Sequence, residues 1–266
     1  MKDFLFNHYL SVKNTSMKLL GIKPKFPHNK LVIWSPEIWS QDRWDFTTVD
    51  KATLKNMFTL KPDWGNYHPK NLIQWYDYSA VECTKFGLEL SITDNMHKDG
   101  DILIGVGVGY VMSKDDYGYG LFEWNVILPT GKQLWPAIWL TDSLTWPPEI
   151  DVLEAYSDDK MKYGRRLNTN LFYSKTPSHL QLGAMRHGNI IDKSKSLNLK
   201  LLWLEDTIEI YYNNYLVRKI TDKNVLKYFT DRKMKVIMNN AIRKESLISE
   251  MAVDPFIIQD FTYYQL

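Results

Sequence analysis

The chain has 266 residues, and its 33 Lys and Arg against 31 Asp and Glu give a formal net charge of +2 at pH 7. A charge this balanced gives no indication of a nucleic-acid or membrane partner, and we expect neither. The single cysteine, Cys83, excludes an intrachain disulfide and a cysteine-based zinc site.

The first segment, residues 1–29, is rich in Lys and Asn, and its apolar residues suit one or two short amphipathic helices. We interpret it as an N-terminal appendage that packs over one end of the following domain, with docking to a partner as the alternative. Asp3, Asn7 and His8 interrupt the apolar stretch that a secretory signal needs, and no run reaches the roughly 20 apolar residues of a membrane-spanning helix. We therefore expect no ordinary secretion, which leaves the cytoplasm, release by lysis or carriage on a particle.

Residues 30–266 are expected to form one domain, because short apolar or alternating runs separated by turn residues are typical of a β-sandwich. The segment AVECTKFGLELSIT predicts two strands joined by a turn at Lys85 to Gly87. The runs LKLLWL, TIEIYY and YLVRKI predict a three-stranded meander, with a positive backbone φ at Asn213 and Asn214. The clearest helix signal spans Asp222 to Tyr228, whose first residue can cap the helix.

Three acidic residues lie close together in PPEIDVLEA. On a regular strand Glu149 and Asp151 share one face, whereas Glu154 falls on the other. One extra residue in a β-bulge between Asp151 and Glu154 would return all three carboxylates to one face. In isolation the hexapeptide EIDVLE also fits a half-exposed strand with three solvated acids.

Carboxyl groups crowded on one face repel each other, which offers no obvious advantage to a structural protein. A retaining glycosidase, however, needs two of them about 5 to 5.5 Å apart, and a third acid between them can tune both pKa values. We assign Glu149 as nucleophile, Glu154 as general acid and then base, and Asp151 as the residue hydrogen-bonded between them. The order of these roles is an inference.

Aromatic residues make up 14% of the chain, and many of them must pack in the core. In WPAIW, however, Trp135, Ala137 and Trp139 lie on one face at strand spacing, so that two indoles flank a small residue. Trp146 immediately precedes two prolines and the acids. We expect these three tryptophans to contact substrate, because sugar rings present apolar C–H faces to indole.

Together these segments resemble glycoside hydrolase family 16, the group of laminarinases, agarases, carrageenases and lichenases. The resemblance covers residues 30–265 and rests on KFGLELSI, GYVMSK, YGLFEWNVILPTGKQLWPAIWL and above all PPEIDVLEA, which fits the family's bulged Glu-x-Asp-x-x-Glu pattern. It implies a β-jelly-roll sandwich of two curved antiparallel sheets, concanavalin A-like, with a concave substrate cleft. It also implies endo-hydrolysis with retention, with Glu149 as nucleophile, Asp151 as assisting acid and Glu154 as acid/base.

Three asparagines are further candidates for substrate binding. Asn170 stands where laminarinase-like members usually carry His, Asn125 stands where Arg is frequent, and Asn239 belongs to the MKVIMNN strand. No cofactor is required and no metal ligand is assigned. Many members bind a structural calcium, for which Glu37 and Asp260 are the candidates, although ordinary surface acids are the simpler interpretation.

The resemblance predicts an enzyme that acts on a β-1,3- or mixed β-1,3/1,4-linked polysaccharide, either a laminarin-like glucan or a marine galactan. A non-catalytic glycan-binding or structural protein of a larger assembly, for example a virus particle, is the alternative. Such proteins commonly lose the catalytic glutamates, which this chain has kept. Transglycosylation is a third possibility, since the glycosyl-enzyme can pass to a sugar hydroxyl instead of water.

Overall fold

In the computed structural model the residues that are described are 40–68, 72–131, 133–156, 166–174, 180–181, 185–189, 196–243 and 254–265. The predicted appendage, residues 1–29, lies outside these ranges. No helix within them is long and apolar enough to cross a membrane.

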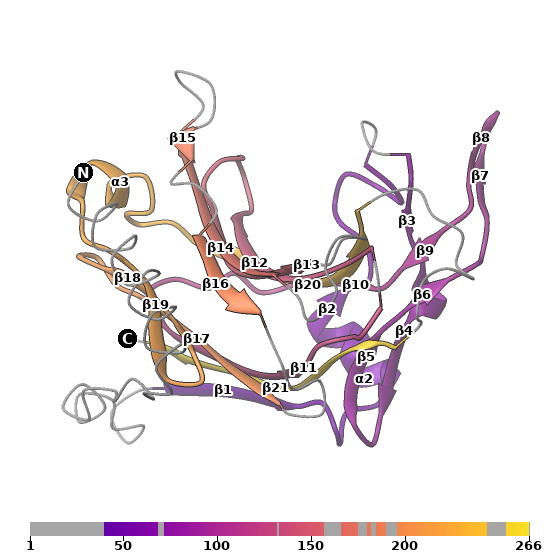
Figure 1. Ribbon diagram of the computed structural model, residues 1–266, viewed down its shortest axis with the longest axis horizontal. Helices are drawn as coiled ribbons and strands as arrows, with labels where there is room; N and C mark the ends of the chain where they lie inside the picture. The colour runs from indigo at the N-terminus through magenta and orange to yellow at the C-terminus, as the bar shows by residue number, and fades with distance from the viewer. Residues whose placement is uncertain are drawn as a thin grey trace.

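Two antiparallel sheets of eight strands each make up most of the molecule and lie one above the other (Figure 1). Sheet A runs in the order β19 (Tyr215–Ile220), β18 (Ile208–Tyr212), β17 (Leu197–Trp203), β11 (Gly120–Ile127), β21 (Phe256–Gln265), β5 (Gly87–Leu90) and β4 (Val81–Thr84), with β1 (Ser40–Asp45) also paired to β21. Sheet B runs in the order β15 (Leu180–Gln181), β14 (Arg166–Ser174), β13 (Glu149–Tyr156), β12 (Leu134–Asp142), β20 (Met234–Ile242), β10 (Tyr110–Ser113) and β2 (Phe58–Thr59), with β16 (Met185–Asn189) also paired to β14.

Smaller elements complete the fold at the end of the sandwich that carries β4 and β2. They are the sheet of β3 (Trp75–Tyr76), β9 (Gly107–Val108) and β6 (Ile92–Thr93), the hairpin of β7 (His97–Asp99) and β8 (Ile102–Ile104), the helix α2 (Lys51–Met57) and the short 3-10 helix η2 (Tyr78–Ala80). In Figure 1 the β7–β8 hairpin and β15, the edge strand of sheet B, rise at opposite ends of the molecule. The helix α3 (Lys223–Leu226) lies on the side of β15.

The core fills the space between the sheets, and strand alternation explains which residues enter it. On β12 the fully buried Ile138 and Leu140 point inward, whereas the partly exposed Trp135 and Trp139 point outward. From sheet A the buried Trp124 stacks on Phe261 with ring centroids 5.1 Å apart. Burial of each large apolar side chain contributes roughly 1.5–3 kcal/mol, so this layer, and not a disulfide, holds the two sheets together.

The predicted all-β sandwich is confirmed, as are several local features. Lys223–Leu226 is helical, and the carboxylate of Asp222 accepts a hydrogen bond from the Asn224 N–H. Asn213 and Asn214 have φ values of 48° and 64°, as expected for this turn. A Cβ on Gly87, at φ 130°, would lie 2.4 Å from the Ile258 carbonyl oxygen, which explains glycine in the turn before β5.

Sequence analysis missed the helix α2. Its start signal was present, because Asp50 accepts a hydrogen bond of 2.7 Å from the Thr53 N–H as an N-cap. Only Leu54 of this helix is buried. The helix therefore lacks the apolar stripe that sequence reasoning depends on.

Candidate active site

A β-bulge in β13 brings the three acids to one face of sheet B. Asp151 pairs with Asn170 of β14, but Glu154 pairs with Asn168, so three steps along β13 match two steps along β14. The pairing with β12 shifts at the same place. Ile150 is fully buried in the core beneath. The predicted bulge is therefore present, and Glu149, Asp151 and Glu154 all lie on the outer face of sheet B, which points away from the core.

Neighbouring strands surround each acid with a different pair of residues. Thr141 and Phe172 lie on either side of Glu149, Trp139 and Asn170 lie on either side of Asp151, and Ala137 and Asn168 lie on either side of Glu154. The central acid thus lies between an indole and a buried amide, and the last acid lies beside the smallest side chain of the row. This arrangement leaves room next to Glu154.

Burial and neighbouring acids raise the pKa values of both Glu149 and Asp151. Burial raises the pKa of Glu149 to about 7, while hydrogen bonds from Trp146 and Asp151 act in the opposite direction. Burial also raises the pKa of Asp151 well above its usual range, and the charges of Glu149 and Glu154 and the hydrogen bond to Glu149 act in the same direction. Both carboxyl groups therefore hold a proton at higher pH than an exposed acid does.

Glu154 has a raised pKa as well. Burial is the main cause, and a hydrogen bond from Trp135 and the positive charge of Arg243 oppose it. A carboxyl group whose pKa is raised in this way holds a proton closer to neutral pH and can donate it to a leaving oxygen.

The three predicted tryptophans surround the acids, but each makes different contacts. Trp146 lies in the loop between β12 and β13, is 39% exposed, and donates from Nε1 to Glu149 Oε2 at 2.8 Å. Its ring packs against Phe172 with centroids 5.7 Å apart. Trp139 packs against a small apolar cluster that includes Ile237 and donates from Nε1 to Asn239 Oδ1 at 2.8 Å.

Two of the predicted asparagines belong to this face. Asn170 is buried, lies directly across from Asp151, and accepts a hydrogen bond of 3.0 Å from the Leu171 N–H. Asn239 lies beside Ala137 in the row of Glu154, and its side chain orients Trp139.

The structure does not place Asn125 with the other residues predicted to bind substrate. It belongs to β11 in sheet A, where Trp124 points into the core and Asn125 therefore points out of the opposite side of the sandwich. Its Nδ2 donates to both carboxylate oxygens of Asp260 at 2.9 Å, and its Oδ1 accepts from Asn198 Nδ2 at 3.0 Å. The structure thus separates Asn125 from the acids by the thickness of the core, a separation that the sequence did not indicate.

The calcium prediction concerns the same outer face of sheet A. Asp260 contacts Asn125 there, and Glu37 lies outside the described residues. Among the side chains that the structure describes, no group of three or more His, Cys, Asp or Glu is arranged to hold a metal ion. The calcium site stays a prediction.

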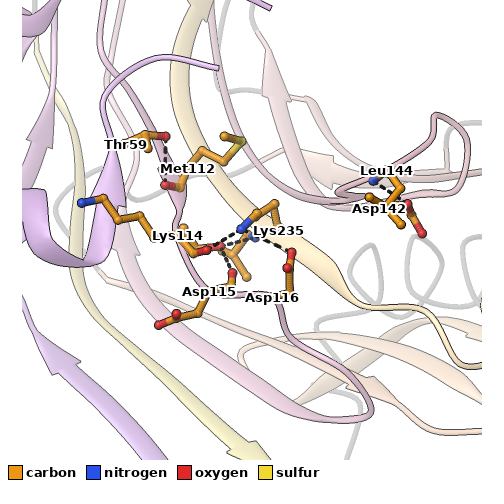
Figure 2. Close-up of polar contacts among 10 residues, drawn as sticks. Thr59, Met112, Lys114, Asp115, Asp116, Asp142, Leu144 and Lys235 are labelled. Carbon is orange, nitrogen blue, oxygen red and sulfur yellow. Dashed lines mark hydrogen bonds and ion pairs between the residues drawn. The ribbon is translucent and has the colours of Figure 1, made fainter. Parts of the chain in front are cut away.

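The loop that carries Trp146 is fixed by a residue that sequence reasoning did not select. Asp142, at the end of β12, is buried and accepts a hydrogen bond of 2.8 Å from the Leu144 N–H (Figure 2). It also accepts one of 2.9 Å from the Thr145 N–H. Its second oxygen lies 3.3 Å from Arg232 Nη1. This anchor limits how Trp146 can approach Glu149.

A lysine close to the row of Glu149 is already paired. Lys235 lies across from Thr141 on β20, and its ammonium group contacts the carboxylate of Asp116 at 3.3 Å and the carbonyl of Lys114 (Figure 2). The ammonium group of Lys235 is therefore paired with Asp116 and not with Glu149.

Strand parity could have identified two further residues of the site. Asn168 and Phe172 lie two positions before and after Asn170 and therefore share its face. Asn168 Nδ2 also donates to the Glu154 carbonyl at 3.3 Å. The acids that Asn168 and Phe172 pair with on β13 follow only from the strand register, which the sequence did not specify.

Comparison with known proteins identifies the family of this chain. Residues 75–247 match the family described as Glycosyl hydrolases family 16, a range that covers well over half of the chain and includes all three acids. The chain belongs to this family.

Individual relatives are distant. The chain is 25% identical over 163 residues to the endo-1,3-1,4-beta-glycanase EglC of Rhizobium meliloti (55% of this chain, 33% of the relative). It is 27% identical over 180 residues to a beta-glucanase of Rhodothermus marinus (62% and 55%). The chain thus spans about a third of the length of EglC and about half of the length of the Rhodothermus marinus beta-glucanase. The laminarinase catalytic domain of Thermotoga maritima has the same fold, with a TM-score of 0.69 at 18% identity (86% of this chain, 98% of that one).

Proposed function

We propose that this chain is a retaining, endo-acting β-glycosidase that hydrolyses a β-1,3- or mixed β-1,3/1,4-linked glucan by double displacement. Family membership supports glycoside hydrolysis; one relative is named an endo-1,3-1,4-beta-glycanase and another a beta-glucanase. The observation that carries the mechanism is the bulge in β13, which places Glu149, Asp151 and Glu154 on one face of sheet B, where burial raises the pKa of each.

In the first step ionised Glu149 attacks the anomeric carbon, and Glu154 transfers its proton to the leaving oxygen, which releases one part of the polysaccharide. The N–H of Trp146 donates to Glu149 and favours the ionised form that can attack. In the second step Glu154, now ionised, takes a proton from water, the water attacks the same carbon, and the bond to Glu149 breaks. Two inversions give net retention.

The small Ala137 beside Glu154 and the indoles of Trp135, Trp139 and Trp146 around the trio suit the binding of flat sugar rings. In sheet B the strands β14, β13, β12, β20 and β10 run side by side, and the acids of β13 lie within this row. We infer that a long chain can lie across these strands, which favours cleavage within the polymer.

The test is the release of reducing ends from laminarin, lichenan, agarose, porphyran, carrageenan and xyloglucan. We expect the wild type to cleave laminarin or lichenan and Glu149→Gln to lose at least about 10³-fold in rate, because the amide cannot form the glycosyl ester. Glu123→Gln is the matched control, since Glu123 lies on the outer face of sheet A in an ion pair with Lys200 and should be dispensable.

Proton NMR of the first products distinguishes retention from inversion, and a fall in viscosity ahead of reducing-end release marks internal cleavage. Cleavage only of a galactan would change the substrate class but keep the mechanism. No cleavage by a folded wild-type protein would contradict the proposal and favour a glycan-binding role. Products longer than the substrate would indicate transglycosylation.

A further inference from the structure

The bulge in β13 contains one extra residue, and that residue is Val152. Toward β12 the register passes from Asp151 directly to Leu153, so Val152 is skipped. Toward β14 the two residues between Asp151 and Glu154 face a single residue, Thr169. Val152 and Leu153 are both fully buried in the core, although consecutive residues of a regular strand point to opposite faces. A bulge disrupts the hydrogen-bond ladder, so carbonyl groups at this point need other donors.

A tyrosine from the opposite sheet supplies such a donor. Tyr212 belongs to β18 of sheet A, is buried, and extends across the core to sheet B. Its hydroxyl donates to the Val152 carbonyl at 2.8 Å and lies 3.1 Å from the Asn168 carbonyl. Asn168 is the residue of β14 that pairs with Glu154. One hydroxyl group therefore joins the extra residue of the bulge to the strand position beside Glu154.

A second side chain of sheet A contacts the residue opposite the bulge. Arg218 belongs to β19 and is buried. Its Nε donates to Thr169 Oγ1 at 2.7 Å, and its Nη2 donates to the Thr169 carbonyl at 2.8 Å. The carbonyl groups of Val152, Asn168 and Thr169 therefore all have polar contacts with sheet A.

The geometry of the bulge decides where Glu154 lies relative to Glu149. The Val152 carbonyl belongs to the rigid peptide unit that leads to Leu153, the residue before Glu154. Rotation of this unit would move the Glu154 carboxyl group along or away from the outer face of sheet B. A retaining glycosidase needs its two carboxyl groups about 5 to 5.5 Å apart, so a contact that restricts this rotation also restricts the catalytic distance.

We propose that Tyr212 is a positioning residue, whose hydroxyl fixes the bulge of β13 and thereby sets the distance between Glu154 and Glu149. The proposal rests on the proposed function in giving that distance a catalytic use, whereas the contact with the bulge is independent of any substrate. Phenylalanine would fill the same space in the core but would leave the Val152 carbonyl without this donor. The hydroxyl, and not the ring, is therefore the part that positions the site.

The variant Tyr212→Phe tests this role, because it removes one oxygen atom and keeps the ring. On whichever of laminarin and lichenan the wild type cleaves, kcat should fall by about 10- to 100-fold with little change in KM, since a misplacement of about 1 Å is enough for such a loss. Proton donation by Glu154 is the step that suffers. The loss should therefore be smaller on an aryl glycoside whose leaving group needs no proton.

The matched control is Tyr263→Phe. Tyr263 of β21 is another tyrosine of sheet A that packs in the core, and its hydroxyl donates to the Tyr119 carbonyl at 3.0 Å, away from the bulge. Each substitution removes one hydrogen bond to a carbonyl and should lower Tm by about 2–4 °C. Only Tyr212→Phe should lower kcat. Equal kcat values in the two variants, or an equal loss on both substrates, would overturn the proposal and reduce Tyr212 to a structural residue.

A double-mutant cycle on kcat identifies the group that Tyr212 positions. In the Glu154→Gln background Tyr212→Phe should cause little further loss of kcat, because the proton donor is already gone. A further loss as large as that in the wild-type background would contradict the action through Glu154.

Amide hydrogen exchange tests the contact without activity. The amides of β13 should exchange faster in Tyr212→Phe than in the wild type, whereas Tyr263→Phe should leave their exchange unchanged. Unchanged protection of β13 in Tyr212→Phe would overturn the proposal. Failure of Tyr212→Phe to fold would also overturn it, because the hydroxyl would then support the whole fold and not the bulge. If the wild type cleaves no polysaccharide, the proposed function fails while this comparison still tests Tyr212.

Discussion

Both outer faces of the sandwich carry acidic residues, but they use them in opposite ways. On sheet A, Glu209 is almost fully buried, yet Lys219 lies 2.5 Å away and the Tyr211 hydroxyl donates to its other oxygen. Glu123 on the same face pairs with Lys200. Each of these acids has a cation on the neighbouring strand.

On sheet B the acids lie next to each other instead. Burial and mutual repulsion raise the pKa values of Glu149 and Asp151, and burial raises that of Glu154. The arrangement therefore costs folding energy, because a pKa raised in the folded state is a loss of stability above that pKa. Neighbouring acids without a cation between them distinguish the outer face of sheet B from the ion pairs on sheet A.

The largest expected effect is the loss of kcat when Glu154 of sheet B is replaced, and Glu209 of sheet A provides the comparison. Glu154→Gln should lower kcat on the natural polysaccharide by about 10²- to 10⁴-fold, because the leaving oxygen loses its proton donor, with little change in Tm. With an aryl glycoside whose leaving group needs no proton, the glycosylation step should lose much less. Steady-state and burst kinetics on both substrates measure this difference, and an equal loss on both would contradict the acid/base role.

Glu209→Gln should behave in the opposite way. It leaves Lys219 without its carboxylate partner and should lower the free energy of unfolding by about 1–3 kcal/mol, while kcat of the folded fraction is retained. Chemical denaturation alongside the activity assay gives both values. Loss of activity without loss of stability would mean that the two faces are not separate in function.

The pH dependence of stability gives the next effect. The pKa of Glu149 rises from 4.5 in its ordinary state to about 7 in the folded chain, so the fold binds a proton that the unfolded chain releases between these values. Wild-type stability should fall as pH rises from 4.5 to 7. Glu149→Gln removes this penalty, so its advantage over the wild type should be absent at pH 4, grow up to pH 7 and then level off at no more than about 3 kcal/mol.

Urea unfolding of both proteins at several pH values measures this difference. An advantage of the same size at pH 4 and pH 8 would show that the amide stabilises the fold by packing and not by removing a charge.

A smaller effect is expected from the hydrogen bond of Trp146. Because its N–H lowers the pKa of Glu149, Trp146→Phe should move the acid side of the kcat/KM profile to higher pH, by about half a pH unit given the partial exposure of the indole. Trp75→Phe, which removes a tryptophan N–H that donates to the Asn95 carbonyl, is the matched control. A shift to lower pH would contradict the assigned donor.

The smallest effect concerns Asn125 on sheet A. Asn125→Ala should leave kcat/KM unchanged and lower the free energy of unfolding by about 1 kcal/mol through its lost contacts with Asp260 and Asn198. A tenfold fall in kcat/KM at unchanged stability would return Asn125 to the substrate site.

Local chemistry explains what could be predicted. The bulge followed from the parity of Glu149, Asp151 and Glu154 on a strand, since only one extra residue returns the third acid to the face of the other two. Trp135 and Trp139 followed from the same alternation. The helix at Lys223–Leu226 and the positive φ values of the asparagine turn followed from capping and turn preferences, which act within a few residues.

The sequence by itself therefore determined the all-β class, the acid trio, its common face and the tryptophans next to it, because these depend on periodicity along one strand. Only the tertiary structure decided that Asn125 lies on the far sheet, that Arg232 reaches Asp142, that Arg218 of sheet A reaches Thr169 and that Tyr212 of sheet A reaches the bulge. Those contacts join residues 44 to 135 positions apart across a strand register and a core, and no local pattern records which distant side chain will arrive there.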